Sequence, residues 1–214
     1  MTNIPPIFIC IKEYSVRCPG KNFELLPYTL DYLQANNHIQ NTVVISDSDI
    51  FKSITNEYNI RDYFIEQRDS SWDELYSCYN YCNHIKYYGN YIILNVTQPL
   101  REYNLIDKCL DIDLKTYDLV TSYTLIPERS VFYLDDNDQF VIKNSERKGC
   151  MCHEQKMADG AIYYTSYGFM TTVINSDNPN KTFWNSSIRF IENNVPFIDI
   201  DTQNDLNIFK QYFK

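Results

Sequence analysis

The sequence lacks several features that would each define a class of protein. It has no apolar run near the roughly 18 residues that a membrane-spanning helix needs, so we expect no membrane segment. Its N-terminus has no basic region followed by a long apolar stretch, which argues against a signal peptide. Lys and Arg number 19 against 28 Asp and Glu, which gives a net charge of −9. Because nucleic-acid binding depends on a concentrated cationic surface, this balance argues against a nucleic-acid partner.

The cysteines also lack a recognisable pattern. There are 7, an odd number, and they are scattered along the chain. This predicts free thiols in a reducing cytoplasm rather than a disulfide framework. Two local groupings with histidine, at residues 78–84 and 150–153, do not have the paired spacing of zinc sites. We therefore interpret them as ordinary reduced cysteines.

What the sequence does contain is enough apolar material for a core. Hydrophobic residues make up 44% and aromatic residues 15% of its 214 residues. That composition excludes a disordered chain, and the length suits one large domain. We find no internal repeat and no flexible linker, so residues 1–214 are expected to form a single domain.

Short apolar runs alternate with segments of helical periodicity. Strands are expected at residues 7–11, 42–45, 63–65, 91–96 and 119–124. Helices are expected at residues 26–34, 72–85 and 105–114, with another through Tyr58 capped by the aspartates of residues 46–49. This alternation predicts an α/β fold: a three-layer α/β/α, Rossmann-like arrangement around a mainly parallel sheet.

The pattern changes after residue 125. Residues 132–142 are expected to form a hairpin, and polar, irregular sequence follows. We interpret residues 126–160 as a flap or dimerisation insertion in the same domain.

The loop at residues 12–22 follows the first buried strand and is rich in cations. In sheets of this kind ligands bind beyond the carboxyl ends of the strands, which directs attention to residues 12–22, 46–49 and 95–101. Arg and Lys side chains, with hydroxyl and backbone N–H donors, can clamp a polyphosphate. A plain solvated loop is the alternative.

Residues 9–22 read I-C-I-K-E-Y-S-V-R-C-P-G-K-N. This run resembles, without a gap, the signature I-P-A-R-x-x-S-x-R-x-P-x-K-N of the acylneuraminate cytidylyltransferases, the CMP-sialic acid synthetase family, which is akin to the CMP-Kdo synthetases. Further stretches resemble the family's other motifs in the same order; these are residues 43–50, Arg68, and residues 94–101, 159–163 and 197–206. The resemblance covers almost the whole chain and implies a nucleotide-binding fold.

The resemblance implies a role for each matching residue. The CTP phosphates would be held by Lys12, Ser15, Arg17, Lys21 and Asn22. The nucleoside would lie near Arg68, Thr97 and Gln98, and Asp199 and Asp201 would bind Mg²⁺.

The chemistry of the acidic pair agrees with that assignment. Carboxylates two residues apart at a strand's end can face one hard cation, and Mg²⁺ prefers one or two carboxylates completed by phosphates and water. A second Asp-x-Asp match, at residues 111–113, follows a predicted helix and is interpreted as a solvated helix end.

The implied reaction follows from charge. A sugar hydroxyl attacks the α-phosphorus of CTP and pyrophosphate leaves, so negative charge builds up on the phosphoryl oxygens. Lys21, Arg17 and Lys12 would stabilise that charge together with Mg²⁺ held by the acidic pair. We therefore expect Lys21, Arg17 and Asp201 to be catalytic.

The acceptor side departs from the family pattern. The family has an Arg-Gln-rich stretch where this chain has residues 149–158 without Arg. Arg129 and Lys156 are the candidates for holding a substrate carboxylate. The expected partners are CTP and an acidic, nonulosonic-acid-like sugar or related acid, and the resemblance also implies a homodimer.

Two other functions stay open. Nucleotide-sugar glycosyltransferases also place an Asp-x-Asp metal site beside a nucleotide, and a non-catalytic homologue would bind nucleotide without turnover. In every case the cations near the N-terminus and the acidic pair near the C-terminus must lie close together.

Overall fold

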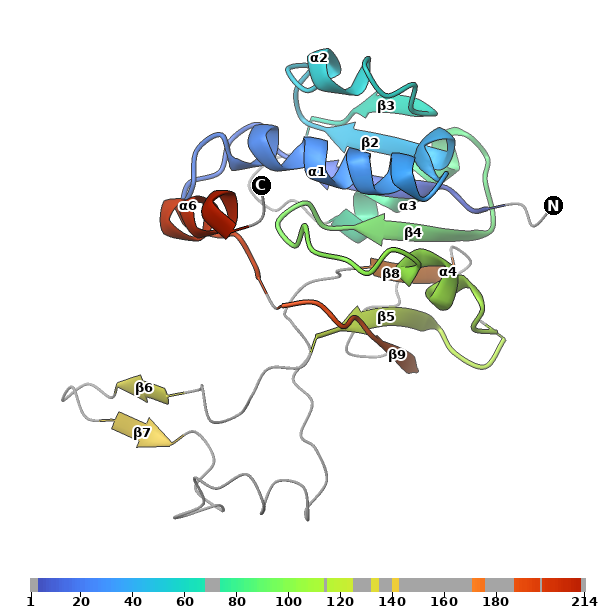
Figure 1. Ribbon diagram of the computed structural model, residues 1–214. Coiled ribbons are helices and arrows are strands. Elements are labelled where there is room, and N and C mark those ends of the chain that lie inside the picture. The colour runs from blue at the N-terminus through green and yellow to red at the C-terminus, as the bar shows by residue number, and fades with distance from the viewer. Residues whose placement is uncertain are drawn as a thin grey trace.

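A seven-stranded sheet forms the centre of the molecule. The computed structural model describes residues 4–67, 74–113, 115–124, 132–134, 140–142, 171–175, 187–196 and 198–212. In spatial order the strands are β3 (Asp62–Ile65), β2 (Thr42–Ser46), β1 (Ile7–Ile11), β4 (Asn90–Leu94), β8 (Thr171–Asn175), β5 (Leu119–Tyr123) and β9 (Ile188–Glu192). Neighbouring strands run parallel except at β8, which is antiparallel to both β4 and β5. The predicted mainly parallel α/β sheet is thus confirmed (Figure 1).

Helices cover both faces of this sheet, which makes three layers. One face packs against α1 (Lys21–Ala35), α4 (Leu105–Leu110) and α6 (Gln203–Tyr212), and the other against α3 (Glu74–His84). Figure 1 shows α1 and α4 in front of the sheet and α3 behind it. Two short helices, η1 (Ile39–Asn41) and α2 (Lys52–Thr55), lie in the connections around β2.

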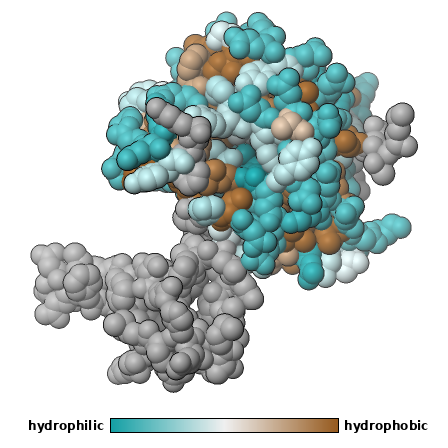
Figure 2. Space-filling view, in the orientation of Figure 1, coloured by the Kyte–Doolittle hydropathy of each residue, from teal (hydrophilic) through white to brown (hydrophobic). Residues whose placement is uncertain are grey.

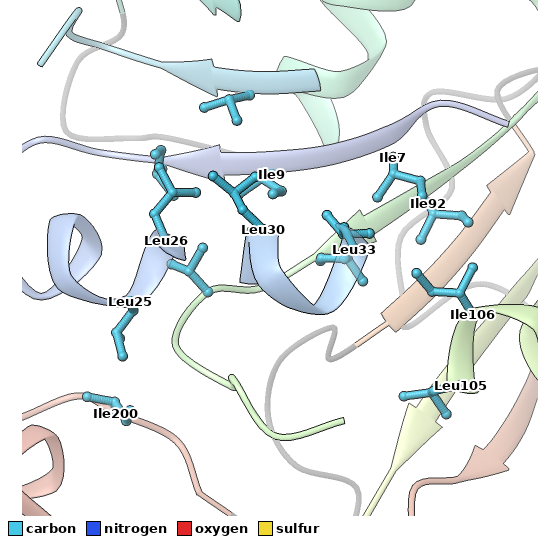
Figure 3. Close-up of a cluster of buried hydrophobic side chains, with 14 of the residues drawn as sticks. Ile7, Ile9, Leu25, Leu26, Leu30, Leu33, Ile92, Leu105, Ile106 and Ile200 are labelled. Atoms are coloured by element: carbon cyan, nitrogen blue, oxygen red, sulfur yellow. The ribbon is translucent and has the colours of Figure 1, made fainter. Parts of the chain in front are cut away.

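The alternation of side chains along β1 explains the two cores. Ile7, Ile9 and Ile11 lie on the α1 side, whereas Phe8 lies on the α3 side. On α1, the leucines at helical spacing pack against these isoleucines. Figure 3 shows Leu26, Leu30 and Leu33 directed at the strands. Burying each such side chain contributes about 1.5–3 kcal/mol, so this face is the main source of stability.

The core on the other face is aromatic. Phe8 makes edge-to-face contacts with Tyr81 of α3 and with Tyr91 of β4, each at a ring-centroid distance of 5.4 Å. The Tyr81 hydroxyl donates to Asp62 Oδ2 of β3 at 2.7 Å. This contact fixes α3 against the sheet and gives its buried hydroxyl a partner.

Several predicted element boundaries differ from the structure. The loop predicted at residues 12–22 ends at Gly20, whose left-handed φ of 80° leads into α1, so Lys21 and Asn22 belong to a helix. The helix predicted to be capped by the aspartates of residues 46–49 is a single turn with Phe51 at its N-cap and no side-chain cap. The helix predicted at 105–114 ends at Leu110, and β4 ends at Leu94 rather than at residue 96.

The hairpin expected at residues 132–142 is confirmed. Strands β6 (Phe132–Leu134) and β7 (Phe140–Ile142) pair antiparallel, with Phe132 opposite Ile142. The rest of the proposed 126–160 insertion lies outside the described residues, as do Arg129, Lys156 and residues 159–163.

Hydrophilic side chains cover most of the described surface on the face that carries α1 and α4 (Figure 2). Within the described residues, none of the helices combines the length and the apolar character needed to cross a bilayer.

Candidate functional site

A cavity of about 470 Å³ opens beyond the carboxyl ends of β1 and β4, where ligands bind in sheets of this kind. Its walls come from four segments: the end of β1 and the loop after it with the start of α1, the first residue of α3, the loop after β4, and the segment before α6. It brings together many of the predicted site residues, namely Lys12, Ser15, Arg17, Lys21, Asn22, Thr97, Asp199 and Asp201.

The loop after β1 is held closed by two hydrogen bonds. The Glu13 backbone N–H donates to Asp47 Oδ1 at the end of β2 at 2.8 Å. The Asn22 side-chain amide donates to the Lys12 carbonyl, also at 2.8 Å, across the base of the loop. Asn22 therefore has a structural role here, in addition to the phosphate contact predicted for it.

Lys21 and Arg17 converge on one carboxylate from the far end of the chain. Lys21 is 6% exposed, and its Nζ donates to the Ile200 carbonyl at 2.7 Å and to Asp201 Oδ1 at 3.0 Å. The guanidinium of Arg17 lies 2.8 Å from Asp201 Oδ2. The expected meeting of N-terminal cations with the C-terminal acidic pair is therefore present in the structure.

The two ion pairs differ in their surroundings. The Lys21 side chain is nearly buried, whereas that of Arg17 is 68% exposed. Solvent screens the Arg17 pair strongly, so it contributes little to stability. Arg17 is consequently free to exchange Asp201 for another anion, while Lys21 is fixed in place by the Ile200 carbonyl.

Asp199 and Asp201 lie on an extended segment that leads into α6 rather than at the end of a strand. The segment is attached to the loop after β4, because the Ile200 N–H donates to the Thr97 carbonyl at 2.8 Å. Ile200 itself is buried in the apolar core, which leaves the two aspartates on either side of it to line the cavity.

Burial raises the pKa of Asp199 above its usual value, and the Asp201 charge adds to that effect. A hydrogen bond from Thr97 acts in the opposite direction. Two carboxylates that repel each other in one cavity favour a bound cation. They are hard oxygen donors of the kind that Mg²⁺ prefers, so the pair fits such an ion. The described residues hold no group of three or more His, Cys, Asp or Glu placed to bind a metal, so phosphate and water would complete the coordination.

Helix α6 begins at the acidic pair with a capping box. Thr202 donates to Asp205 Oδ2 through its N–H and its hydroxyl, both at 2.8 Å, and the Asp205 N–H donates back to Thr202 Oγ1 at 3.3 Å. Burial opposes ionisation of Asp205, but the Thr202 hydrogen bonds and that from the Asp201 N–H leave its pKa below the usual value. The Thr-x-x-Asp spacing was the sequence signal that would have predicted this helix.

A buried arginine supports the loop after β4. Arg101 donates to the Asn95 carbonyl at 2.6 Å and to Thr29 Oγ1 of α1 at 3.4 Å, with its guanidinium 5.7 Å from the centre of the Tyr32 ring. Burial lowers the pKa of Arg101 to about 10, so it stays charged at neutral pH. The Asn95 side chain in turn accepts from the N–H and the hydroxyl of Thr97.

The remaining predicted nucleotide contacts have different outcomes. Gln98 is 1% exposed and is not among the residues that line the cavity, because its side chain is enclosed in the protein. Arg68 lies outside the described residues. Sequence reasoning gave no site role to five residues that do line the cavity: Cys10, Tyr14, Glu74, Asn95 and Val96. Cys10 and Tyr14 lie within the matched N-terminal motif, which was the available signal.

Comparison with known proteins gives a result at the level of fold. No protein-family model and no curated protein matches the chain. Among solved structures, a CMP:2-keto-3-deoxy-manno-octonic acid synthetase in complex with CTP matches with a TM-score of 0.67 and 12% identity over 98% of each chain. HddC from Yersinia pseudotuberculosis, complexed with GMP-PN, matches with a TM-score of 0.62 and 15% identity over 99% of this chain and 100% of the other.

A third similar structure is 4-diphosphocytidyl-2C-methyl-D-erythritol synthase from Anaerococcus prevotii, with a TM-score of 0.58 and 16% identity over 97% of this chain and 96% of the other. The chain therefore has the α/β fold of these proteins over nearly its full length. One of these structures is a CMP:2-keto-3-deoxy-manno-octonic acid synthetase, but the three do not single out the acylneuraminate family.

Proposed function

We propose that the protein is a Mg²⁺-dependent nucleotidyltransferase that couples CTP to an acidic sugar, or a related acid, and releases pyrophosphate. The observation that carries this proposal is the convergence of Lys21 and Arg17 on Asp201 inside the cavity. Cations and carboxylates held together in a polar cavity are the groups that a metal–triphosphate complex needs.

The charges in the cavity explain why a metal is part of the proposal. Three cations, Lys12, Arg17 and Lys21, face three carboxylates, so the lining is close to neutral; the carboxylates are Glu74, Asp199 and Asp201. A triphosphate adds several negative charges that this lining does not offset. When bound, Mg²⁺ would supply that charge, polarise the phosphate and lower the pKa of the acceptor hydroxyl.

The roles of the protein's own groups follow from their partners. Asp199 and Asp201 would hold the cation, which releases Arg17 and Lys21 from Asp201. Lys21 is oriented by the Ile200 carbonyl, so its ammonium would meet a phosphate without a large movement. Arg17, which lines the cavity and is 68% exposed, would bind the phosphates. Lys12, Ser15 and Asn22 would complete the phosphate site, with Thr97 near the nucleoside.

The acceptor side of the proposal rests on chemistry and resemblance. One neighbour in fold is a CMP:2-keto-3-deoxy-manno-octonic acid synthetase, which supports an acidic acceptor. Arg129 and Lys156 are the proposed contacts for the acceptor carboxylate, and Arg68 stays a proposed contact of the nucleoside. We also propose a homodimer formed through the 126–160 insertion of a single domain, in a reducing cytoplasm; the five described cysteines are free thiols.

The nucleobase has one alternative that an observation favours. HddC was solved with GMP-PN, a guanine nucleotide, on the same fold. A guanylyltransferase would use the same phosphate and metal groups, so base preference must be measured rather than assumed.

The experiment is release of pyrophosphate from each of the four nucleoside triphosphates, with Mg²⁺ and a panel of 2-keto sugar acids. The proposal expects release with CTP and at least one acid. Release with GTP instead would favour the guanine alternative. Transfer of sugar from an added nucleotide sugar, without release of pyrophosphate, would favour a glycosyltransferase. Binding of nucleotide without any product would indicate a non-catalytic homologue.

The matched pair Asp201→Asn and Asp113→Asn tests the metal assignment in the same assay. Both residues end an Asp-Ile-Asp sequence, but Asp113 is exposed and is not part of the cavity. Asp201→Asn is expected to abolish turnover with the fold intact, and Asp113→Asn to leave it unchanged. Normal turnover in Asp201→Asn would refute the metal assignment.

A further inference from the structure

Two thiols meet at the wall of the cavity. Cys10 lies on β1 and is half-buried, with its side chain lining the cavity. Cys78 lies in the middle of α3 and is fully buried. Their sulfur atoms are 3.6 Å apart, which is van der Waals contact. None of the contacts proposed for catalysis uses either thiol.

The surroundings make this pair different from the other described cysteines. Cys18, Cys82 and Cys109 are buried, so Cys10 is the described thiol that a reagent in the cavity can reach. Burial raises the pKa of the Cys78 thiol, which therefore stays protonated and unreactive until a neighbouring sulfur is activated.

A bond between the two sulfurs needs only a small movement. A disulfide has an S–S length of about 2.05 Å, so the two atoms must approach by roughly 1.5 Å. Cys10 is paired with Ile45 in the interior of the sheet, and β1 lies between β2 and β4. Much of the movement must therefore come from the side chains and from α3, whose first residue, Glu74, also lines the cavity.

We propose that Cys10 and Cys78 form a redox modification site that closes the nucleotide cavity when it is oxidised by a peroxide. Hydrogen peroxide converts the Cys10 thiol to a sulfenic acid and is itself reduced to water. The Cys78 sulfur then attacks the Cys10 sulfur, the S–S bond forms, and a second water leaves with the Cys78 proton. In sum, two thiols and one peroxide give one disulfide and two waters.

The effect on ligand binding follows from the position of Cys10 and rests on the proposed function. Cys10 is two residues before Lys12, and its sulfur also lies 3.8 Å from the Glu74 carbonyl. The disulfide draws α3 toward β1 at this wall of the cavity. Displacements of about 1 Å in a binding site misplace the groups that contact the ligand. We expect oxidation to weaken nucleotide binding at least tenfold, and bound nucleotide to shield Cys10.

Peptide mapping tests the bond. The full-length protein is treated with hydrogen peroxide, free thiols are alkylated in denaturant, and the chain is cut with trypsin. A cross-link between residues 1–12 and 69–86, through Cys10 and Cys78, is the expected product. Cys10→Ser and Cys78→Ser should each abolish it. Cys82→Ser, on the same tryptic peptide, should retain it. Absence of the cross-link, or its loss in Cys82→Ser, overturns the proposal.

Binding of Mg²⁺–CTP, measured by calorimetry before and after oxidation, tests the closure. The reduced protein should bind, the oxidised protein should bind at least tenfold more weakly, and dithiothreitol should restore binding. Equal affinity of the cross-linked and reduced proteins contradicts the closure. If the reduced protein binds neither CTP nor GTP, the proposed function fails. The peptide map still decides whether the thiol pair reacts.

Discussion

The apolar core beneath α1 and the cavity at the edge of the sheet are built in opposite ways. In the core, leucines of α1 contact isoleucines of β1 and β4, and each contact repeats a regular spacing along the chain (Figure 3). In the cavity, Lys21 contacts Ile200 and Asp201, residues about 180 positions away, through single hydrogen bonds. The core is redundant, whereas the cavity depends on a few individual contacts.

The core therefore determines the stability of the protein, whereas the cavity determines its chemistry. Buried leucines contribute in proportion to their apolar area and touch no ligand. The exposed Arg17–Asp201 pair of the cavity is hydrated, so it adds little to stability, but its charges set the field around a bound phosphate. Substitutions in the two regions should therefore have different readouts.

Among the substitutions that compare the core with the cavity, the largest effect is expected for Arg17→Gln. Loss of one preorganised cation at the reacting phosphates should lower kcat on the order of 10²–10³-fold. Because the Arg17 side chain is 68% exposed, the free energy of unfolding should change by less than about 0.5 kcal/mol. Steady-state pyrophosphate release and urea denaturation measure the two quantities. Activity within twofold of the unmodified protein would remove Arg17 from the mechanism.

Leu30→Ala should show the reverse. Leu30 is a fully buried residue of α1, so its truncation should lower the free energy of unfolding by about 2–5 kcal/mol. At a temperature where the variant is folded, kcat should change by less than about threefold. Gln34→Ala, at an exposed position of the same helix, is the matched control and should be neutral. An unchanged unfolding midpoint in Leu30→Ala would contradict the core described here.

Arg101→Lys tests a residue that joins the two regions. Lys keeps the charge but loses the fork that contacts both Asn95 and Thr29. We expect about a tenfold loss in kcat/KM, together with a loss of about 1–3 kcal/mol in stability. Kinetics and denaturation on one preparation measure both. A stability loss with unchanged kinetics would show that Arg101 supports only the core.

The smallest effect concerns pH and lies outside the cavity. Burial lowers the pKa of His38 below its ordinary 6.5, and the Asp107 carboxylate, 3.3 Å from Nε2, offsets part of this. The unfolded chain thus binds the proton more readily, so the free energy of unfolding should fall as pH drops below about 6.5. His38→Asn should flatten that dependence, and Asp107→Asn should steepen it. Denaturation curves between pH 5 and 7.5 measure the pH dependence of the unmodified protein, His38→Asn and Asp107→Asn. Parallel profiles for the three proteins would refute the role of His38.

The comparison also explains what the sequence predicted. The first five strands and the α1 and α3 helices follow from periodic apolar runs such as Ile7–Ile11, because local pattern and burial agree there. Strands β8 and β9 were missed because their pairing with β4 and β5 depends on distant segments. Helix α6 was missed because it was interpreted only as a motif and not as a capped helix.

The candidate site was likewise predicted in part. The family motif placed Lys21, Arg17 and Asp201 together although no local pattern does, and the structure agrees. The motif also implied a nucleoside contact for Gln98, but the side chain of Gln98 is enclosed in the protein. A motif gives residue types and not side-chain directions. Cys10 was overlooked although it lies within the matched motif, because that motif assigns it no contact, and Glu74 was overlooked because an exposed helix start carries no distinctive signal.

The most direct test of the central claim is the Mg²⁺ dependence of CTP binding, measured by calorimetry. Two matched double variants are compared with the unmodified protein: Asp199→Asn with Asp201→Asn, and Asp111→Asn with Asp113→Asn. We predict that Mg²⁺ strengthens CTP binding at least tenfold in the unmodified protein and in the 111/113 variant. In the 199/201 variant the metal should have no effect. An equal Mg²⁺ effect in both double variants would contradict the claim that the acidic pair and the N-terminal cations share one metal–triphosphate complex.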